Sequence, residues 1–158
     1  MTELVHPTGR NKEVSFSDFE PFIKTGDTPP EVKLRFTVFL QELFNQTKVV
    51  WVPGSCYSTQ WMEEHTKKIL RESRFSGIKV EPRHWARAHF WLVATVEGFD
   101  KELIIDPTGV VTPGEDHYQR PETIVPFFGL KNLAPSNSKY IYGKGEPLGK
   151  EGYHVFHP

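Results

Sequence analysis

Two neighbouring segments of sheet-forming residues, joined by a short turn, limit the ways in which this chain can fold. Residues 88–98 read AHFWLVATVEG and residues 101–109 read KELIIDPTG, with the turn sequence EGFDK between them. Both segments are rich in β-branched and aromatic residues, which favour strands. The short turn predicts that the two strands pair as an antiparallel hairpin. The register of this hairpin then decides which side chains share a face of the sheet.

The register can be derived from the turn. If Glu97 pairs with Asp100, then His89 pairs with Thr108 and Trp91 pairs with Asp106. In this register His89 and Asp106 are diagonal neighbours on one face, within reach of a hydrogen bond between their side chains. A slip of one residue would place them on opposite faces.

A stripe of apolar residues at helical spacing predicts a long helix that begins at Pro30. Proline suits the first helical position because its missing N–H group is not needed there. The stripe is of the kind that packs against a core, and it consists of Val32, Phe36, Phe39, Leu40, Leu43 and Phe44.

The 158 residues fit one domain. We divide it into an N-terminal extension (1–29), a core (30–109) and a Pro/Gly-rich C-terminal segment (110–158), which is expected to wrap the core and to wall a cleft. The further predicted elements are a short strand at 49–52, a second helix at 55–73 and a strand at 78–85. In the C-terminal segment, TIVPFFGL and KYIYG are predicted as strands or packing segments.

The only cysteine, Cys56, lies where the short strand ends and the second helix is predicted to begin. Ser55 suits the N-cap position, which would place Cys56 in the first turn, facing inward. The positive end of a helix dipole favours the thiolate form of a cysteine. The alternative is that Cys56 is a small side chain that fills a gap in the core.

Composition narrows the class of partner. The chain has 19 basic and 20 acidic residues and no block of Lys and Arg, so its charge does not indicate that it binds nucleic acid. One cysteine excludes an intramolecular disulfide and the usual cysteine-based zinc site. No apolar run is long enough to cross a membrane, and the first residues lack the features of a secretion signal. We expect a cytoplasmic protein, or one delivered without a recognisable signal peptide, and the oligomeric state stays open.

A cysteine, a histidine and an aspartate together predict nucleophilic catalysis. Cys56 would attack as the thiolate, His89 would act as general base and then general acid, and Asp106 would orient the imidazole. The backbone N–H of Cys56 would be the first oxyanion donor. The candidates for the second donor and for substrate contacts are Gln46, Trp51, Gln60 and Trp91. Trp91 lies two residues after His89 and would shield the catalytic pair from water.

Three short motifs occur in a characteristic order: Gly54-Ser55-Cys56, His89-Phe90-Trp91 and Asp106-Pro107-Thr108. The chain from about 50 to 109 thereby resembles the transglutaminase-like branch of the papain-like cysteine hydrolases and transferases, whose core reads G-x-C, H-x-W and D-P-T. The resemblance implies an α+β fold in which N-terminal helices pack on an antiparallel sheet and the cysteine lies at a helix N-terminus. It also implies Cys-His-Asp chemistry through a thioester. Its substrate would be a protein or peptide amide, processed by glutamine deamidation, peptide cleavage or acyl transfer. Nothing in the sequence corresponds to calcium sites.

Two other hypotheses remain open at this point. The first is a non-enzymatic binding module that keeps the transglutaminase-like fold, in which Cys56 is inert. The second is a metal-dependent hydrolase built on His84 and His89 with His117 or Asp116, whose spacing matches no standard metal-binding pattern. We expect neither a metal nor a cofactor. Among the amide reactions, hydrolysis is favoured because it needs only water as second substrate.

Overall fold

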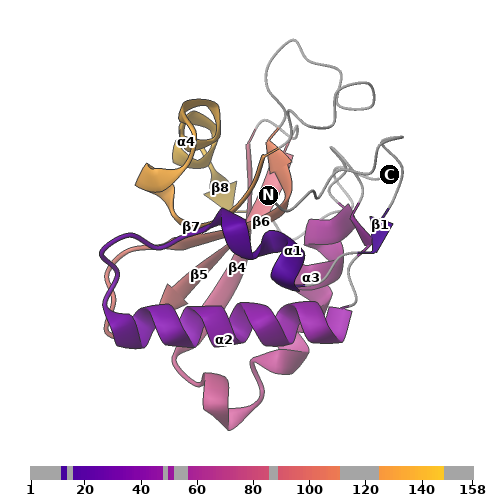
Figure 1. Cartoon of the computed structure of the whole chain (residues 1–158), viewed down its shortest axis with the longest axis vertical. Helices are drawn as coiled ribbons and strands as arrows, with labels where there is room; N and C mark the ends of the chain where they lie inside the picture. Colours follow the sequence, from indigo (N-terminus) through magenta and orange to yellow (C-terminus); the bar gives the residue numbers. More distant parts are fainter. Residues whose placement is uncertain are drawn as a thin grey trace.

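The computed structural model describes residues 12–13, 16–47, 50–51, 57–85, 89–110 and 125–147. Its helices and strands alternate irregularly, so the fold is α+β (Figure 1). In chain order the elements are β1 (Lys12–Glu13), α1 (Phe16–Phe19), η1 (Glu20–Phe22), β2 (Ile23–Lys24), α2 (Pro30–Thr47), β3 (Val50–Trp51), α3 (Tyr57–Ile69), η2 (Ser73–Phe75), β4 (Ile78–Trp85), β5 (His89–Val96), β6 (Leu103–Val110), β7 (Val125–Leu130), η4 (Lys131–Leu133), α4 (Ser136–Gly143) and β8 (Glu146–Pro147).

The main sheet has six strands in the order β2-β7-β6-β5-β4-β8. Neighbouring strands are antiparallel except at one edge, where β2 runs parallel to β7. The expected antiparallel sheet is therefore found in part, and the sheet is mixed because β2, from the N-terminal region, runs parallel to β7 at one edge. A separate pair is formed by β1 and β3.

The predicted hairpin register is confirmed where the two strands pair. Leu92 pairs with Ile105 and Ala94 with Leu103, which is the register that follows from pairing Glu97 with Asp100. The turn is closed by a hydrogen bond from the Phe99 N–H to the Val96 carbonyl (3.0 Å). The same register orients His89 and Asp106 towards one face of the sheet.

The two faces of the sheet carry separate clusters of apolar side chains. The face with Leu92, Ala94 and Ile105 packs against α2 and α3. The predicted stripe on α2 is confirmed, since all six of its side chains are buried in this cluster. Burial of each large apolar side chain stabilises the fold by about 1.5–3 kcal/mol. The opposite face carries Trp91, Val93 and Ile104, which pack with residues of β7 and α4.

The second helix is shorter than predicted. The described helix α3 ends at Ile69, and the Glu72 N–H then bonds to the Ile69 carbonyl (3.0 Å), which tightens the last turn. A 3₁₀ helix follows and buries Phe75 against Phe39. The chain leaves the helical path there because Phe75 must enter the core before β4 begins. The predicted N-cap, Ser55, lies outside the described residues.

The described part of the C-terminal segment, residues 125–147, belongs to the main fold. Strand β7 lies inside the sheet, between β2 and β6, as the pattern of TIVPFFGL predicted for a strand. The segment KYIYG, predicted as a strand or packing segment, belongs to helix α4. In this helix Ser138 and Tyr142 are buried, whereas Tyr140 between them is exposed; this pattern suits a helix and not a strand, in which all three would share a face.

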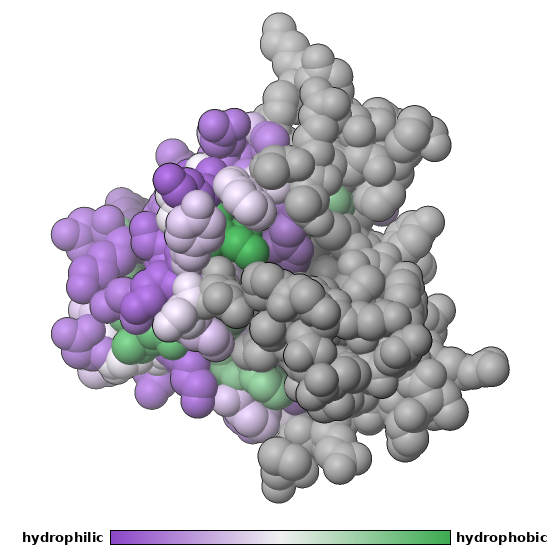
Figure 2. Space-filling model, turned by 90° about the horizontal axis from the view of Figure 1, so that it is seen from above, coloured by the Kyte–Doolittle hydropathy of each residue, from purple (hydrophilic) through white to green (hydrophobic). Residues whose placement is uncertain are grey.

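The described part of the N-terminal extension is also integrated. Phe19 is fully buried and packs against Phe44 and Phe128. The described surface in Figure 2 is mainly hydrophilic, with apolar side chains in small patches. Among the described residues, the helices are all too short or too polar to cross a bilayer.

Candidate functional site

The centre of the candidate site is a hydrogen bond between a histidine and an aspartate. His89 is the first residue of β5, and Asp106 is the fourth residue of β6. The distance between Nε2 of His89 and Oδ2 of Asp106 is 2.7 Å. His89 is 9% exposed and Asp106 is fully buried. The proximity predicted from the hairpin register is therefore confirmed.

The Asp106 carboxylate is held by two further donors. The Tyr142 hydroxyl donates to Oδ2 (2.6 Å), and the Gly109 backbone N–H donates to Oδ1 (3.0 Å). Gly109 has a positive φ of 83°, and the pairing of β6 with β7 shifts between Asp106 and Val110. This local irregularity turns the Gly109 N–H back towards the carboxylate. The three donors compensate for burying a carboxylate away from water.

Tyr142 is the site residue that the sequence did not reveal. It lies on α4, 36 positions after Asp106, and no local pattern links the two. Burial raises the pKa of Tyr142 well above its ordinary value, and the negative charge of Asp106 and the hydrogen bond to it raise the pKa further. Tyr142 therefore stays protonated and remains a donor to the carboxylate at neutral pH.

The raised pKa of Tyr142 predicts a loss of stability in alkali. In the unfolded chain this group loses its proton near pH 10, whereas in the folded protein it keeps the proton. The unfolded state then binds fewer protons, so the free energy of unfolding should fall as pH rises above about 10, by at most about 1.4 kcal/mol per pH unit for this group. Urea unfolding at several alkaline pH values measures the slope.

Two variants isolate the contribution of Tyr142 to that slope. Tyr142→Phe should remove the contribution of this group to the slope. At neutral pH it should lower the free energy of unfolding by about 1 kcal/mol, because one hydrogen bond is lost. Tyr140→Phe is the matched control, because Tyr140 lies on the same helix and is 60% exposed, and it should keep the slope. An unchanged slope in Tyr142→Phe would contradict the buried donor.

Trp91 covers the histidine, as predicted. Its indole stacks on the His89 imidazole with ring centroids 5.6 Å apart and an angle of 22° between the planes. The indole also meets Tyr142 edge to face, with ring centroids 5.2 Å apart. Trp91 is 1% exposed. Water is therefore excluded from one face of the imidazole, and the aromatic rings fix its orientation.

Of the remaining candidates, only Gln46 has a described side chain. Cys56 lies outside the described residues, as do the side chains of Trp51 and Gln60. Gln46 lies in the last turn of α2, where its amide donates to Glu42 on the same helix (2.8 Å). The amide nitrogen of Gln46 is therefore used in a hydrogen bond within its own helix, and this structure does not place it as an oxyanion donor.

Helix α3 begins near the end of the sheet where His89 lies. The chain leaves α3 at Ile69 and enters β4 at Ile78 after a short connection, and the far end of β4, at Trp85, pairs with His89. The 13-residue helix is about 20 Å long and packs along β4, β5 and β6. Figure 1 shows α3 descending towards the connection that leads to β4. Its first residue, Tyr57, therefore lies towards the end of the sheet where His89 is found, although α3 packs on the face opposite to the His89 side chain.

The metal hypothesis finds no support in the part of the chain that is described. Within it, no three His, Cys, Asp or Glu side chains are grouped so as to hold a metal ion. His117 and Asp116 lie outside the described residues. His84 lies on β4 and pairs with Phe90 of β5.

In comparisons with known proteins, the chain matches no family model, no curated protein and no solved structure. The chemistry of the site is therefore inferred from its residues and their geometry.

Proposed function

We propose that this protein is a cysteine-dependent enzyme that acts on amides, with Cys56 as nucleophile, His89 as general base and acid, and Asp106 as the group that orients the imidazole. The observation that carries the proposal is the buried hydrogen bond of 2.7 Å between His89 and Asp106. A histidine held by a carboxylate is the arrangement that activates a nucleophile in unrelated hydrolases. The order of the three motifs, which resembles that of transglutaminase-like proteins, supports the same assignment.

The hydrogen bond determines which nitrogen of His89 can act as the base. An ionised carboxylate only accepts, so Nε2 of His89 carries the proton that it donates to Asp106. In the neutral ring Nδ1 then carries the lone pair. The proposed base is therefore Nδ1 of His89, and Asp106 stabilises the imidazolium that forms when this atom takes a proton.

The proposed reaction has two stages. In the first, Nδ1 of His89 takes the thiol proton of Cys56, the sulfur bonds to the amide carbonyl carbon, and the C–N bond breaks as His89 returns the proton to the leaving nitrogen. The product is a thioester on Cys56 and free ammonia or amine. In the second stage water, or an amine, attacks the thioester and releases the thiol. Water yields a deamidase or a peptidase, and an amine yields an acyl transferase.

Two features support the place of Cys56 in this scheme. In the sequence it directly precedes Tyr57, the first residue of α3, and this end of α3 lies towards the end of the sheet where His89 is found. Because α3 packs on the face opposite to His89, Cys56 would have to approach the imidazole around that end of the sheet. The N-terminus of a helix favours a thiolate over a thiol. We favour hydrolysis among the second stages, because it needs no second organic substrate.

Thiol labelling tests the proposal directly. The chain has one cysteine, so the mass of the intact protein reports the alkylation of Cys56 by iodoacetamide. At about pH 6.5 we expect the folded protein to react about tenfold faster than the chain unfolded in urea, because an ordinary thiol with a pKa near 8.5 is almost fully protonated there. His89→Asn should remove most of this advantage.

The control is His65→Asn on α3, which should leave the labelling rate unchanged. A folded protein that reacts no faster than the unfolded chain, and that is insensitive to His89→Asn, would identify Cys56 as inert and favour the binding module. If the thiol is reactive, incubation with glutamine-containing peptides then separates the reactions by mass. Deamidation converts glutamine to glutamate, cleavage shortens the peptide, and transfer attaches an added amine.

A further inference from the structure

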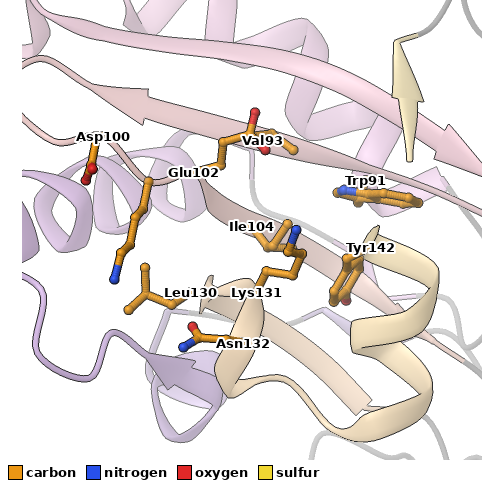
Figure 3. Close-up of a pocket in the computed structure, with 10 residues that line it drawn as sticks. Trp91, Val93, Asp100, Glu102, Ile104, Leu130, Lys131, Asn132 and Tyr142 are labelled. Carbon is orange, nitrogen blue, oxygen red and sulfur yellow. The ribbon is translucent and has the colours of Figure 1, made fainter. Parts of the chain in front are cut away.

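A cavity of about 530 Å³ lies on the sheet face that carries His89 and Asp106. Its size is within the range of small-molecule sites. Figure 3 shows the residues that line it: Trp91, Val93, Asp100, Lys101, Glu102, Ile104, Leu130, Lys131, Asn132 and Tyr142. The floor is apolar, formed by Val93 and Ile104 of the hairpin. Charged side chains surround this floor.

One wall of the cavity holds a buried donor without an acceptor. Nε1 of Trp91 is inaccessible to water and has no hydrogen-bond partner among the described residues. An indole N–H can only donate, and a buried unsatisfied donor costs free energy. Figure 3 shows the nitrogen edge of the indole turned towards the middle of the cavity. The group that would satisfy it must therefore be an acceptor.

The indole cannot turn elsewhere to find that acceptor. His89 stacks on it and Tyr142 packs against it. The backbone at Gly145 lies so close to the benzene edge of the indole that a Cβ built there would be 2.4 Å from Cζ2. The direction of the N–H group is thus fixed by three neighbours.

A second donor reaches the same space. Lys131, the first residue of η4, is exposed and forms no salt bridge within the described part of the chain. Figure 3 shows its side chain extending over the cavity, with the ammonium group towards the middle. The carboxylates on the wall come from Asp100 and Glu102, next to the hairpin turn, and Glu102 is paired with Arg83 (2.9 Å).

We propose that this cavity binds a small carboxylate with an apolar stem. The carboxylate would accept hydrogen bonds from Nε1 of Trp91 and from the Lys131 ammonium group, and the stem would lie on Val93, Ile104 and Leu130. Because the indole nitrogen is covered in this structure, the ligand must displace the group that covers it. A free short-chain acid and the C-terminus of a peptide share this chemistry. The proposal goes beyond the amide chemistry and does not depend on Cys56.

Titration with pentanoate, followed by NMR of the indole N–H groups, tests the proposal. The chain has four tryptophans, and the signal missing from Trp91→Phe assigns Trp91. A new hydrogen bond should move the Trp91 signal downfield until the site saturates. Pentanamide, which has the same stem without the charge, should bind at least about tenfold more weakly, since a hydrogen bond to a charged group is worth about that factor.

Lysine variants test the second donor. Lys131→Met keeps the stem of the side chain and should weaken pentanoate binding about tenfold. Lys79→Met is the control, because Lys79 is an exposed lysine that does not line this cavity, and it should leave binding unchanged. Because Lys131 is exposed, its replacement leaves the core intact even if Trp91→Phe does not fold.

Two results would overturn the proposal. One is the absence of a saturable shift of the Trp91 signal at millimolar pentanoate. The other is an equal affinity for pentanamide and pentanoate, or an equal affinity of Lys131→Met and of the unaltered protein for pentanoate. A short peptide that ends in leucine, tested with a free and with an amidated C-terminus, shows whether the ligand is a peptide end or a free short-chain acid. Tighter binding of the free-acid peptide than of pentanoate identifies a polypeptide end as the ligand, and weaker binding identifies a small metabolite.

Discussion

Asp106→Ala should lower the free energy of unfolding by about 3–5 kcal/mol, the range for removing one partner from a buried charged network. The carboxylate is fully buried and accepts from His89, Tyr142 and the Gly109 N–H. Alanine leaves these three donors without an acceptor, and each buried unsatisfied donor costs about 1–3 kcal/mol. Urea unfolding followed by circular dichroism measures the loss.

Two substitutions distinguish the effect of losing the hydrogen-bond network on stability from the effect of losing any carboxylate. Asp100→Ala removes an exposed aspartate from the turn of the same hairpin and should change the stability by no more than about 0.5 kcal/mol. Asp106→Asn keeps an acceptor oxygen but removes the negative charge, so its loss should lie between the two. A loss below about 1 kcal/mol for Asp106→Ala would contradict the three hydrogen bonds.

Asp106→Asn also separates stability from chemistry. An amide group in place of the carboxylate no longer stabilises the imidazolium of His89, and it favours the wrong ring tautomer. The iodoacetamide rate of Cys56 should therefore fall in this variant while the protein remains folded. If labelling is unchanged, Asp106 serves only the fold.

The central pair was predictable because its determinants are local. The alternation of β5 and β6 and the short turn between them determine the register, and the register determines that His89 and Asp106 share a face. Helix α2 was predictable for the same reason, since its apolar stripe and Pro30 both lie within the element. Each of these inferences needed only neighbouring residues.

The features of the fold and of the site that the sequence did not predict depend on contacts between distant parts of the chain. Tyr142 completes the network from α4, and its role follows from the way α4 packs on the sheet and not from its neighbours in sequence. The segment around it is short and rich in tyrosine, which suits a strand as well as a helix. The parallel pairing of β2 with β7 joins two-residue and six-residue strands about a hundred positions apart, and a two-residue strand carries no periodic signal.

The parallel edge of the sheet predicts a second large effect, at Gly129. This residue pairs with Lys24 of β2 and has a φ of 141°, a conformation that side chains other than glycine rarely adopt. A Cβ built at Gly129 would lie 2.0 Å from the Lys24 carbonyl oxygen and 2.6 Å from its carbon. The atoms in contact are backbone, so no side-chain rotation can relieve the overlap.

Gly129→Ala should therefore destabilise the fold by about 3 kcal/mol or more, from backbone strain of about 1–3 kcal/mol and overpacking of about the same size. Strand β2 would have to move away from β7, which would loosen Phe19 from Phe128. Urea unfolding gives the total loss, and hydrogen exchange at Ile23 and Lys24 should show faster opening of this edge than of β5.

Gly98→Ala is the matched control for this prediction. Gly98 also has a positive φ, of 86°, but a Cβ built there would meet nothing within 4 Å. Alanine at Gly98 therefore carries the conformational cost, about 1–2 kcal/mol, without the overlap. The difference between the two variants measures the close approach of β2 to β7. Equal losses at both positions would mean that β2 does not pack against Gly129, and the edge of the sheet would then have to end at β7.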